Sequence, residues 1–227
     1  LHANVVVAAR RRDALEEVAQ GIRSAGGQAE VVATDVSDPA QVEALADAAT
    51  RRFGRIDVWM NIAGVGANGR FWEIPAADQA RIVDVNLKGV VYGSHAALRR
   101  FVAQGRGTLV NMGSVESEVP LAYHATYAAT KAGLIGMAKV WALEFGEHGI
   151  TANAVGPGPI RTELFDRANP HNSPRTRAIV EAVPMRRLGT PEDVANAVAF
   201  LLDTRSGFVT GQALYVCGGM TVGAAGA

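Results

Sequence analysis

The sequence has little cysteine, no net charge and no long apolar run. Its 227 residues include one cysteine, Cys217, so no disulfide can form within the chain. Its 22 basic and 22 acidic side chains balance, which leaves no basic excess for nucleic acid or an anionic membrane. The longest apolar runs are of strand length, too short for a membrane span. These absences predict a protein of the reducing cytoplasm with neither nucleic acid nor membrane as partner.

Targeting, repeat and metal signals are also missing. No secretory-signal pattern opens the chain, and we find neither an internal repeat nor a low-complexity segment. His95, His124 and His148 do not have the spacing of metal ligands, so we predict no metal site. With 48% hydrophobic residues, the composition suits a single globular domain over residues 1–227.

An alternation of short apolar runs and helical segments fills most of the chain. The apolar runs predict buried strands, and the segments between them have the period of helices. We expect strands at residues 4–9, 28–35, 55–64, 107–114, 150–160 and 211–219. We expect helices at residues 12–26, 39–54, 75–104, 124–145 and 191–203, the third with a break in its middle. The predicted fold class is therefore α/β: a doubly wound parallel sheet with helices on both faces.

Residues 161–189 interrupt this alternation because they are charged and punctuated by proline. A long segment of this kind beside the carboxyl edge of a sheet is predicted to be a substrate lid. After it, Thr190 has the features of a helix N-cap and Pro191 those of a first helical residue.

One pair of side chains stands out in the predicted helix 124–145. Tyr127 and Lys131 are four residues apart, which places them on one face, one turn from each other. Alone, such a pair is typical of a solvated helix face. However, Ser114 ends the preceding strand, and ligands of open parallel sheets bind outside the carboxyl ends of the strands. That rule brings Ser114 and the loop after Asn61 to the same crevice. A serine at a strand end is otherwise typical of a turn or helix cap.

These motifs, in this order, resemble the short-chain dehydrogenase/reductase family over essentially the whole chain. "YAATK" is similar to the family's Tyr-x-x-x-Lys motif, and "NIAG" to its Asn-Asn-Ala-Gly turn, with Ile62 in place of the second asparagine. "TDVSD", "NAVGPGPIRT" and "SGFVTGQALYVCGG" match further segments, with Cys217 where an aspartate is frequent. The resemblance implies a Rossmann-like fold and an oxidoreductase that uses a nicotinamide cofactor.

The resemblance also implies which residues form the site. The catalytic set is Asn86, Ser114, Tyr127 and Lys131. The cofactor-binding set, including the arginines discussed below, is Arg10, Arg11, Asp35, Val36, Asn61, Ala63, Gly64, Tyr127, Lys131, Pro157, Gly158, Ile160 and Thr162. In this scheme Asp35 bonds adenine, Lys131 also holds the nicotinamide ribose, and the Pro-Gly segment lies against the nicotinamide. Asn86 anchors a water in a proton relay; its alternative role is packing at a helix kink.

The chemistry explains the Tyr-Lys pair. Hydride transfer between a carbinol carbon and nicotinamide requires a proton to move at the oxygen. The pKa of a free phenol is about 10, so Tyr127 is a poor base at neutral pH. An ammonium within about 4–6 Å lowers such a pKa. We therefore predict that Lys131 lowers the pKa of Tyr127, and that Ser114 holds the substrate oxygen beside it.

The end of the first predicted strand bears on the choice of cofactor. An acidic residue there would bond the adenosine ribose and repel a 2′-phosphate. Ala9 takes that position, and Arg10 and Arg11 follow it. The planar fork of arginine suits phosphate, so we predict NADP(H) over NAD(H). The alternative is an ordinary solvated helix start.

The glycine-rich motif that follows the family's first strand is missing from this sequence. The chain opens where the family's second strand would lie, and strand 1 of the order 3-2-1-4-5-6 joins strand 2 to strand 4. We therefore expect the runs 4–9 and 28–35 to lack a strand linking them to the rest. We expect that a strand, turn and helix of on the order of 30 residues are omitted from the sequence. The alternative is a chain defective in binding the pyrophosphate.

The first functional hypothesis is an NADP(H)-dependent short-chain alcohol dehydrogenase or carbonyl reductase. It interconverts a ketone or aldehyde with an alcohol, with Tyr127 as acid and base. A 3-oxoacyl thioester reductase, acting on an acyl carrier protein or CoA substrate, remains open within this class, and so does a sugar-alcohol or xenobiotic alcohol dehydrogenase. A non-catalytic nucleotide-sensing member is the alternative from another class.

Two further expectations concern surfaces. His124 either lines the substrate pocket or serves as a cap or loop residue, and Trp72 and Tyr123 either contact substrate or are buried. We take Ala96, Ala97, Met137 and Trp141 as outer apolar positions of two helices. Such positions suit helix packing across a twofold axis, and the family resemblance implies a homotetramer.

Overall fold

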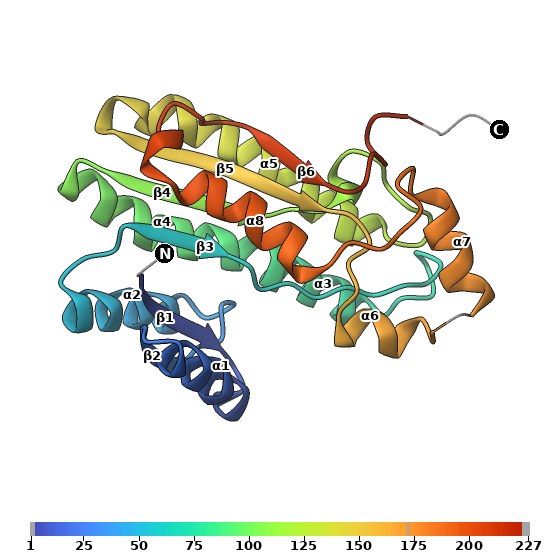
Figure 1. Cartoon of the computed structure of the whole chain (residues 1–227), viewed down its shortest axis with the longest axis horizontal. Coiled ribbons are helices and arrows are strands. Elements are labelled where there is room, and N and C mark those ends of the chain that lie inside the picture. Colours follow the sequence, from blue (N-terminus) through green and yellow to red (C-terminus); the bar gives the residue numbers. More distant parts are fainter. Residues whose placement is uncertain (1–2, 172, 224–227) are drawn as a thin grey trace.

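The computed structural model describes residues 3–171 and 173–223 of the chain (Figure 1). Its strands are β1 (Asn4–Ala9), β2 (Gln28–Ala33), β3 (Val58–Asn61), β4 (Gly107–Met112), β5 (Ile150–Pro157) and β6 (Ala213–Val216). Its α-helices are α1 (Arg12–Ser24), α2 (Pro39–Phe53), α3 (Ala76–Val83), α4 (Gly89–Gln104), α5 (Ala125–Phe145), α6 (Glu163–Ala168), α7 (Pro174–Ala182) and α8 (Pro191–Leu202). No helix in the described ranges has both the length and the apolar character that crossing a membrane requires.

The strands form two parallel sheets. β1 pairs with β2, from Asn4 opposite Gln28 to Ala9 opposite Ala33. The other sheet has the order β3-β4-β5-β6. Among the described residues no strand joins the two sheets. That a linking strand is omitted from the sequence stays a prediction. The predicted α/β fold with parallel pairing is confirmed.

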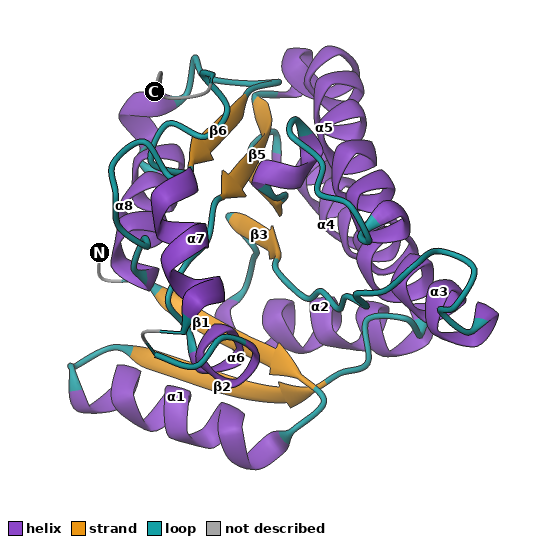
Figure 2. Cartoon of the chain, turned by 90° about the vertical axis from the view of Figure 1, so that its right-hand side faces the viewer, coloured by secondary structure: helices purple, strands orange, loops and turns teal. Residues whose placement is uncertain are grey.

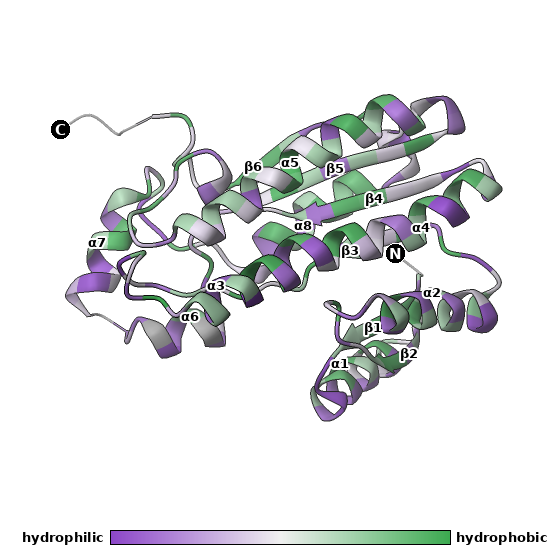
Figure 3. Cartoon of the chain, turned by 180° about the vertical axis from the view of Figure 1, so that it is seen from behind, coloured by the Kyte–Doolittle hydropathy of each residue, from purple (hydrophilic) through white to green (hydrophobic). Residues whose placement is uncertain are grey.

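Helices cover both faces of the larger sheet. In Figure 2, α4 and α5 lie on one side of β3, β5 and β6, and α8 lies on the other. Helix α1 packs on β1 and β2, and α2 contacts α4 as well as both strands of the smaller sheet. Helix α2 therefore links the two sheets. In Figure 3, β1 and most of β2 are hydrophobic, whereas the outward turns of α1 are hydrophilic.

The largest core cluster lies between α2, α4 and the strands β4 and β5. Phe101 of α4 and Leu109 of β4 are completely buried there. Gly107, the first residue of β4, is required by this packing, because a Cβ at that position would lie 2.1 Å from Cγ of the Phe101 ring. Ala96 and Ala97 also belong to this core, so the prediction that they are outer positions is wrong. Trp141 packs against the same cluster.

Local signals fix where several helices begin. Asp38 caps α2 by accepting from the N–H groups of Ala40 and Gln41, and Pro39 occupies the first turn. Thr190 and Asp193 form the capping box of α8, which confirms Thr190 as its N-cap. The expected break in the third helix is also present. It is a π-helical turn, Asp84–Lys88, between α3 and α4.

Residues 161–189, the predicted lid, contain α6 and α7. Both helices lie at the right-hand end of Figure 1, beyond the carboxyl end of β5. Thr162 caps α6 and Ser173 caps α7. The segment returns to the sheet through a parallel bridge between Ile160 and Gly189. Its role as a lid stays a prediction.

Candidate active site

The carboxyl ends of β4 and β5 and the first turns of α5 form the candidate active site. Gly113 donates to the carbonyl of Val155 at 2.7 Å, which ties the two strand ends together. Ser114 follows directly, and its side chain lies near enough to Tyr127 to lower the pKa of the phenol against the effect of burial. Lys131 lies one turn further along α5, with its Nζ 5.7 Å from the centre of the Tyr127 ring. The three side chains predicted from the motifs therefore lie together.

Ser114 has a structural role as well. It is buried, and its Oγ accepts from the N–H of Glu116 at 3.1 Å, which caps the short 3₁₀ turn Val115–Ser117. Ser117 in turn accepts from the N–H of Ser114 at 3.3 Å. The cap and the contact with Tyr127 coexist, because a hydroxyl has two lone pairs and one donor. The cap fixes the rotamer that presents Ser114 to the phenol.

Lys131 is buried, with 4% of its surface exposed. Its Nζ donates to the carbonyl of Met112 at 2.7 Å, at the end of β4. Burial lowers the pKa of Lys131 to about 8. An ammonium has three donors, and within the described residues that of Lys131 uses one of them, in the bond to Met112. Two donors are thus left for a ligand at the carboxyl end of β4.

The prediction that Lys131 lowers the pKa of Tyr127 is wrong for this structure. Burial raises the pKa of Tyr127, the contact with Ser114 opposes that rise, and the Glu116 carboxylate adds to it. The lysine is directed to the Met112 carbonyl, so its charge does not decide the titration of the phenol. In this state Tyr127 holds its proton at neutral pH.

Asn86 lies in the π-helical turn and is completely buried. Its Nδ2 donates to the carbonyl of Val65 at 2.8 Å, and its Oδ1 accepts from the Val65 N–H at the same distance. A further bond at 3.3 Å reaches Thr130 of α5. The amide therefore clamps the loop after β3 against α5. Both donors of the amide are used, and its Oδ1 keeps one lone pair. The proposed relay water at Asn86 stays a prediction.

Asn61, at the end of β3, faces the interior. Its Nδ2 donates to Ser94 and Asn111, each at 2.9 Å, and its Oδ1 accepts from the indole of Trp59 at 2.8 Å. This network joins β3, β4 and α4. Both donors of the Asn61 amide are thus engaged within the protein, and a cofactor contact by this residue stays a prediction.

The loop after β3 brings two further predicted cofactor residues to the site. A Cβ at Gly64 would lie 3.4 Å from Nζ of Lys131 and 3.6 Å from Oδ1 of Asn86, so the backbone passes directly over both. Ala63 precedes it in this exposed loop. Val36 lies elsewhere, packed against Gly89, where a Cβ would lie 2.9 Å from Cγ2 of the valine.

The predicted nicotinamide segment continues from the end of β5. Pro157 is the last residue of β5, and Gly158 donates to the carbonyl of Val216 at 2.9 Å. Ile160 forms the bridge to Gly189, and Thr162 caps α6. The segment thus runs from the sheet edge into residues 161–189.

The adenine end of the predicted site has a different character. Arg10 and Arg11 follow β1 and are exposed, and no ion pair or hydrogen bond engages their side chains within the described ranges. Asp35 follows β2, and its Oδ1 accepts from the N–H and hydroxyl of Ser37. These bonds and the charges of Arg10 and Arg81 lower the pKa of Asp35.

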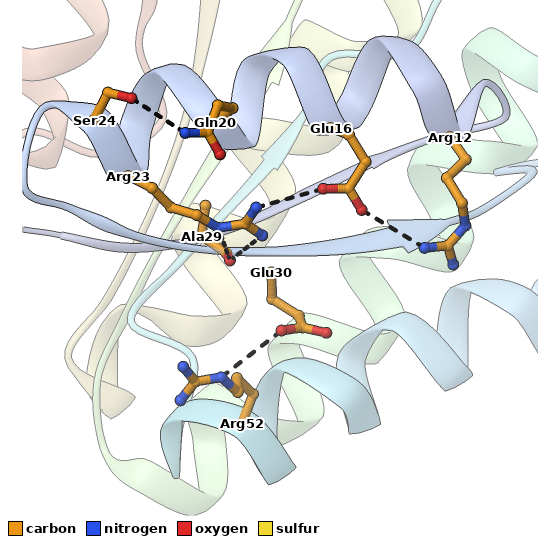
Figure 4. A network of polar contacts seen from close by, with 8 residues as sticks. All are labelled: Arg12, Glu16, Gln20, Arg23, Ser24, Ala29, Glu30 and Arg52. Carbon is orange, nitrogen blue, oxygen red and sulfur yellow. Dashed lines mark hydrogen bonds and ion pairs between the residues drawn. The ribbon is translucent and has the colours of Figure 1, made fainter.

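The neighbouring arginines are engaged, as Figure 4 shows. Arg12 lies 3.8 Å from Glu16, and Arg23 donates to Glu16 and to the carbonyl of Ala29. Arg52 lies 3.7 Å from Glu30. The acidic groups drawn around the smaller sheet are thereby paired with other arginines, which leaves Arg10 and Arg11 available for an anion.

A cavity of about 440 Å³ opens beside Tyr127. Its apolar walls include Phe71, Trp72 and Ile74, and the loop before α5 contributes Tyr123 and His124. Trp72 and Tyr123 are 78% and 57% exposed, so they form the mouth of the cavity rather than part of a core. His124 precedes α5 but makes no capping bond with its side chain.

Sequence reasoning missed Glu116. This carboxylate is buried two residues after Ser114, and both its oxygens lie 3.0 Å from Nδ1 of His124. No spacing rule connects residues eight apart in a loop. The signal available was weaker: a carboxylate immediately beside the predicted catalytic serine.

Comparison with known proteins is consistent with this geometry. The family model described as "Enoyl-(Acyl carrier protein) reductase" matches residues 2–221. The 3beta-hydroxysteroid dehydrogenase 1 of Eggerthella lenta is 39% identical over 221 residues, which is 96% of this chain and 84% of the relative. Glucose 1-dehydrogenase 2 of Bacillus subtilis is 34% identical, over 91% of this chain and 80% of the relative.

A solved structure supports the fold and the family. The gluconate 5-dehydrogenase of Burkholderia cenocepacia, in complex with NADP and tartrate, superposes with a TM-score of 0.91 at 32% identity. The superposition covers 97% of this chain and 86% of that protein. The chain belongs to the short-chain dehydrogenase/reductase family of NAD(P)-dependent oxidoreductases, which act on hydroxyl and carbonyl groups.

Proposed function

We propose that this protein interconverts a ketone or aldehyde with an alcohol, using NADP(H). The observation that carries the proposal is the position of Tyr127 on the wall of the 440 Å³ cavity, with Ser114 next to it and the buried amine of Lys131 5.7 Å from the centre of its ring. A carbonyl oxygen bound between the two hydroxyls would meet one hydrogen-bond donor and one acid.

The roles follow from the protonation states. The raised pKa of Tyr127 keeps the phenol protonated at neutral pH, which suits an acid in carbonyl reduction. A reduced nicotinamide held beside Tyr127 would contribute the hydride chemistry. Tyr127 gives its proton to the carbonyl oxygen, and Ser114 holds that oxygen in place. In alcohol oxidation Tyr127 takes the proton back.

The residues at the carboxyl end of β4 suit the nicotinamide half of the cofactor. Two donors of the buried Lys131 ammonium are available for ribose hydroxyls. The loop passes close to that amine at Gly64, where a Cβ would be in van der Waals contact with Nζ at 3.4 Å. Pro157, Gly158, Ile160 and Thr162 would line the nicotinamide, and Asp35 keeps one oxygen, Oδ2, for adenine.

The preference for NADP(H) is supported by charge. Arg10 and Arg11 are exposed beyond β1, and neither side chain forms an ion pair or hydrogen bond in the described part of the chain, although the charge of Arg10 acts on Asp35. Their guanidinium groups could bond a 2′-phosphate bidentately. The Burkholderia neighbour, whose structure contains NADP, is in keeping with this preference.

An assay with purified protein tests the function. Oxidation of NADPH would be followed optically against a panel of small ketones, aldehydes and a 3-oxoacyl thioester. We expect turnover of at least one carbonyl, and a loss on the order of 10²–10⁴-fold in kcat for Tyr127→Phe, because the acid is removed. Tyr92→Phe, on α4, is the matched control.

The outcomes separate the hypotheses. Unchanged turnover in Tyr127→Phe would refute the mechanism. Binding of NADPH without turnover of any carbonyl would favour the nucleotide-sensing alternative. Turnover of the thioester alone would favour the 3-oxoacyl thioester reductase. The 3-oxoacyl-[acyl-carrier-protein] reductase of Vibrio cholerae is 35% identical to this chain, over 86% of this chain and 79% of the relative.

Assembly and location are part of the same proposal. Exposed apolar side chains on α4 and α5 include Val91, Val102, Val140 and Leu143. Leu143 is 86% exposed. These positions, rather than Ala96 and Ala97, are suited to helix packing in a homotetramer. The single cysteine supports a cytoplasmic location.

A further inference from the structure

Glu116 and His124 form a contact that the proposed chemistry of Tyr127 does not use. Nδ1 of His124 is 3.0 Å from both carboxylate oxygens of Glu116. The glutamate side chain is 10% exposed and that of the histidine 25%. A carboxylate buried to this degree requires a partner, and the imidazole supplies it.

Both residues are held in place by their backbones. Glu116 lies in the 3₁₀ turn capped by Ser114, so its position is coupled to that of the candidate catalytic serine. His124 follows Tyr123, whose φ of 74° lies in the left-handed region that side chains rarely adopt. The carbonyl of Tyr123 accepts from Gly69 at 3.3 Å. Strained backbone of this kind often marks a functional site.

The other edge of the imidazole is available to a ligand. With Nδ1 engaged by Glu116, Nε2 is on the opposite side of the ring and has no hydrogen-bond partner in the described part of the chain. His124 lines the same cavity as Tyr127, and the two rings meet edge to face with centroids 6.2 Å apart. Nε2 of His124 is therefore available for a hydrogen bond to a ligand that lies beside Tyr127.

We propose that His124, positioned by Glu116, binds a second oxygen of the substrate and makes the enzyme selective for hydroxy ketones and diols. The inference rests on the proposed function, because it places the reacting oxygen at Tyr127. His124 would be a specificity-determining residue and Glu116 a positioning residue. Neither transfers the proton of the reaction.

A hydroxyl suits this position better than a purely apolar group or an ether. The carboxylate holds the Nδ1 proton, so neutral His124 presents Nε2 as an acceptor. Protonated His124 presents the same nitrogen as a donor. A hydroxyl can meet either form, since it both donates and accepts. Two other polar side chains of the cavity wall have partners within the chain, since Arg70 lies 3.7 Å from Glu73 and Thr126 donates to Gln79.

A matched pair of small substrates tests the proposal. Acetoin and 2-butanone differ by one hydroxyl on the carbon beside the carbonyl, and kcat/KM would be measured for both with NADPH. We expect the wild type to favour acetoin by about tenfold, the value of one hydrogen bond to a well-placed group. His124→Phe should bring the ratio close to one, mainly through the KM of acetoin. Equal values in the wild type would refute the proposal.

The chain contains a matched control at the other end of α5. His148 and Glu147 form a second pair at 3.9 Å, with side chains 40% and 82% exposed. His148→Phe should leave the acetoin preference unchanged. His124→Gln retains a polar group and should keep part of the preference. Glu116→Leu should reduce it although the imidazole remains, and an unaltered ratio in both His124→Phe and Glu116→Leu would contradict the proposal.

A binding measurement separates this inference from the proposed function. Calorimetry on Tyr127→Phe with NADPH would compare 2,3-butanediol with 2-butanol, without any turnover. Tighter binding of the diol that is lost when His124→Phe is added supports the inference, even if no carbonyl is reduced. Turnover of ketones with equal binding of the diol and the monool would leave the function standing and overturn the role of His124.

Discussion

The two ends of the candidate site are built in opposite ways. At the catalytic end, Asn86, Ser114 and Lys131 are buried and bonded to neighbouring backbone or side chains. At the adenine end, Arg10 and Arg11 are exposed and make no such bonds within the described ranges. The catalytic side chains are therefore held by partners within the chain, whereas these two arginines are not.

The difference reflects what each end has to do. Proton and hydride transfer need reacting groups held within a fraction of an ångström, which requires packed and hydrogen-bonded side chains. Recognition of a phosphate tolerates mobile arginines, because charge attraction acts over several ångströms. Substitutions should consequently cost stability and turnover at the first end, and cofactor affinity alone at the second.

The largest effect is expected for Asn86→Leu. The substitution keeps the side-chain volume but removes the amide of Asn86. The N–H and carbonyl of Val65, which each bond that amide at 2.8 Å, are then left unpaired. Two unpaired backbone groups should cost about 2–5 kcal/mol of unfolding free energy, together with most of the turnover. Chemical denaturation and kcat would measure both effects.

Asn169→Leu is its control. Asn169 is also buried, but the described bond of its Nδ2 is a single one to Phe165 at 3.1 Å. We expect the smaller loss of stability there. Equal losses at positions 86 and 169 would mean that the clamp on Val65 has no special weight, and the comparison between the two ends would fail.

Lys131→Met tests the buried amine through the pH dependence of stability. Burial lowers the pKa of Lys131 from 10.5 to about 8, so between these values the unfolded chain binds more protons than the native one. The unfolding free energy of the cofactor-free protein should therefore rise with pH in this window, by about 3 kcal/mol in full. The variant should lose that rise.

Denaturation at several pH values between 8 and 10.5 measures the effect. Lys139→Met, at an exposed position of the same helix, controls for loss of a lysine elsewhere. The difference between wild type and Lys131→Met is the informative quantity, because Tyr127 is present in both proteins and the contribution of its raised pKa is common to them. A difference that does not change with pH would show that the amine is solvated.

Arg10→Ala and Arg11→Ala test the exposed end. Each should raise the KM for NADPH and leave that for NADH nearly unchanged, so that the NADPH preference falls on the order of tenfold per arginine. Neither should change stability measurably. Arg12→Ala is the matched control, since Arg12 is already within 3.8 Å of Glu16. An unchanged preference in both variants would refute the assignment of NADP(H).

The sequence and structure agree best where local pattern decides the outcome. The apolar run 4–9 became β1 without a shift in bounds, and the spacing of Tyr127 and Lys131 placed them one turn apart. The hydrogen-bond partners that come from distant parts of the chain could not be predicted from the sequence. Nothing local indicates that Asn86 bonds Val65, or that Glu116 reaches His124.

Two errors have the same origin. Ala96 and Ala97 were predicted as outer positions, but small apolar residues fit either a core or an interface. The packing of α2 on α4 places both alanines in the core. The pKa of Tyr127 was expected to fall because Lys131 is near in sequence. Its direction depends instead on burial and on Glu116, which only the folded chain brings together.

The smallest effect is expected for Glu116→Gln, read from the pH profile. The Glu116 carboxylate contributes to the raised pKa of Tyr127, after burial has acted. Removal of that negative charge should lower the pKa of the phenol. Alcohol oxidation needs the deprotonated phenol and rises through this pKa, so its acid limb should move to lower pH. Carbonyl reduction needs the protonated form, and its alkaline limb should move in the same direction.

Glu118→Gln provides the control for this profile. Glu118 lies two residues further on, and its carboxylate is 3.4 Å from the hydroxyl of Tyr215 rather than beside Tyr127. Its removal should leave both limbs in place. A shift to higher pH in Glu116→Gln would mean that the carboxylate acts on Tyr127 by orienting His124 and not by its charge. The catalytic end would then owe its proton affinity to geometry, and the contrast with the charge-dependent adenine end would be greater still.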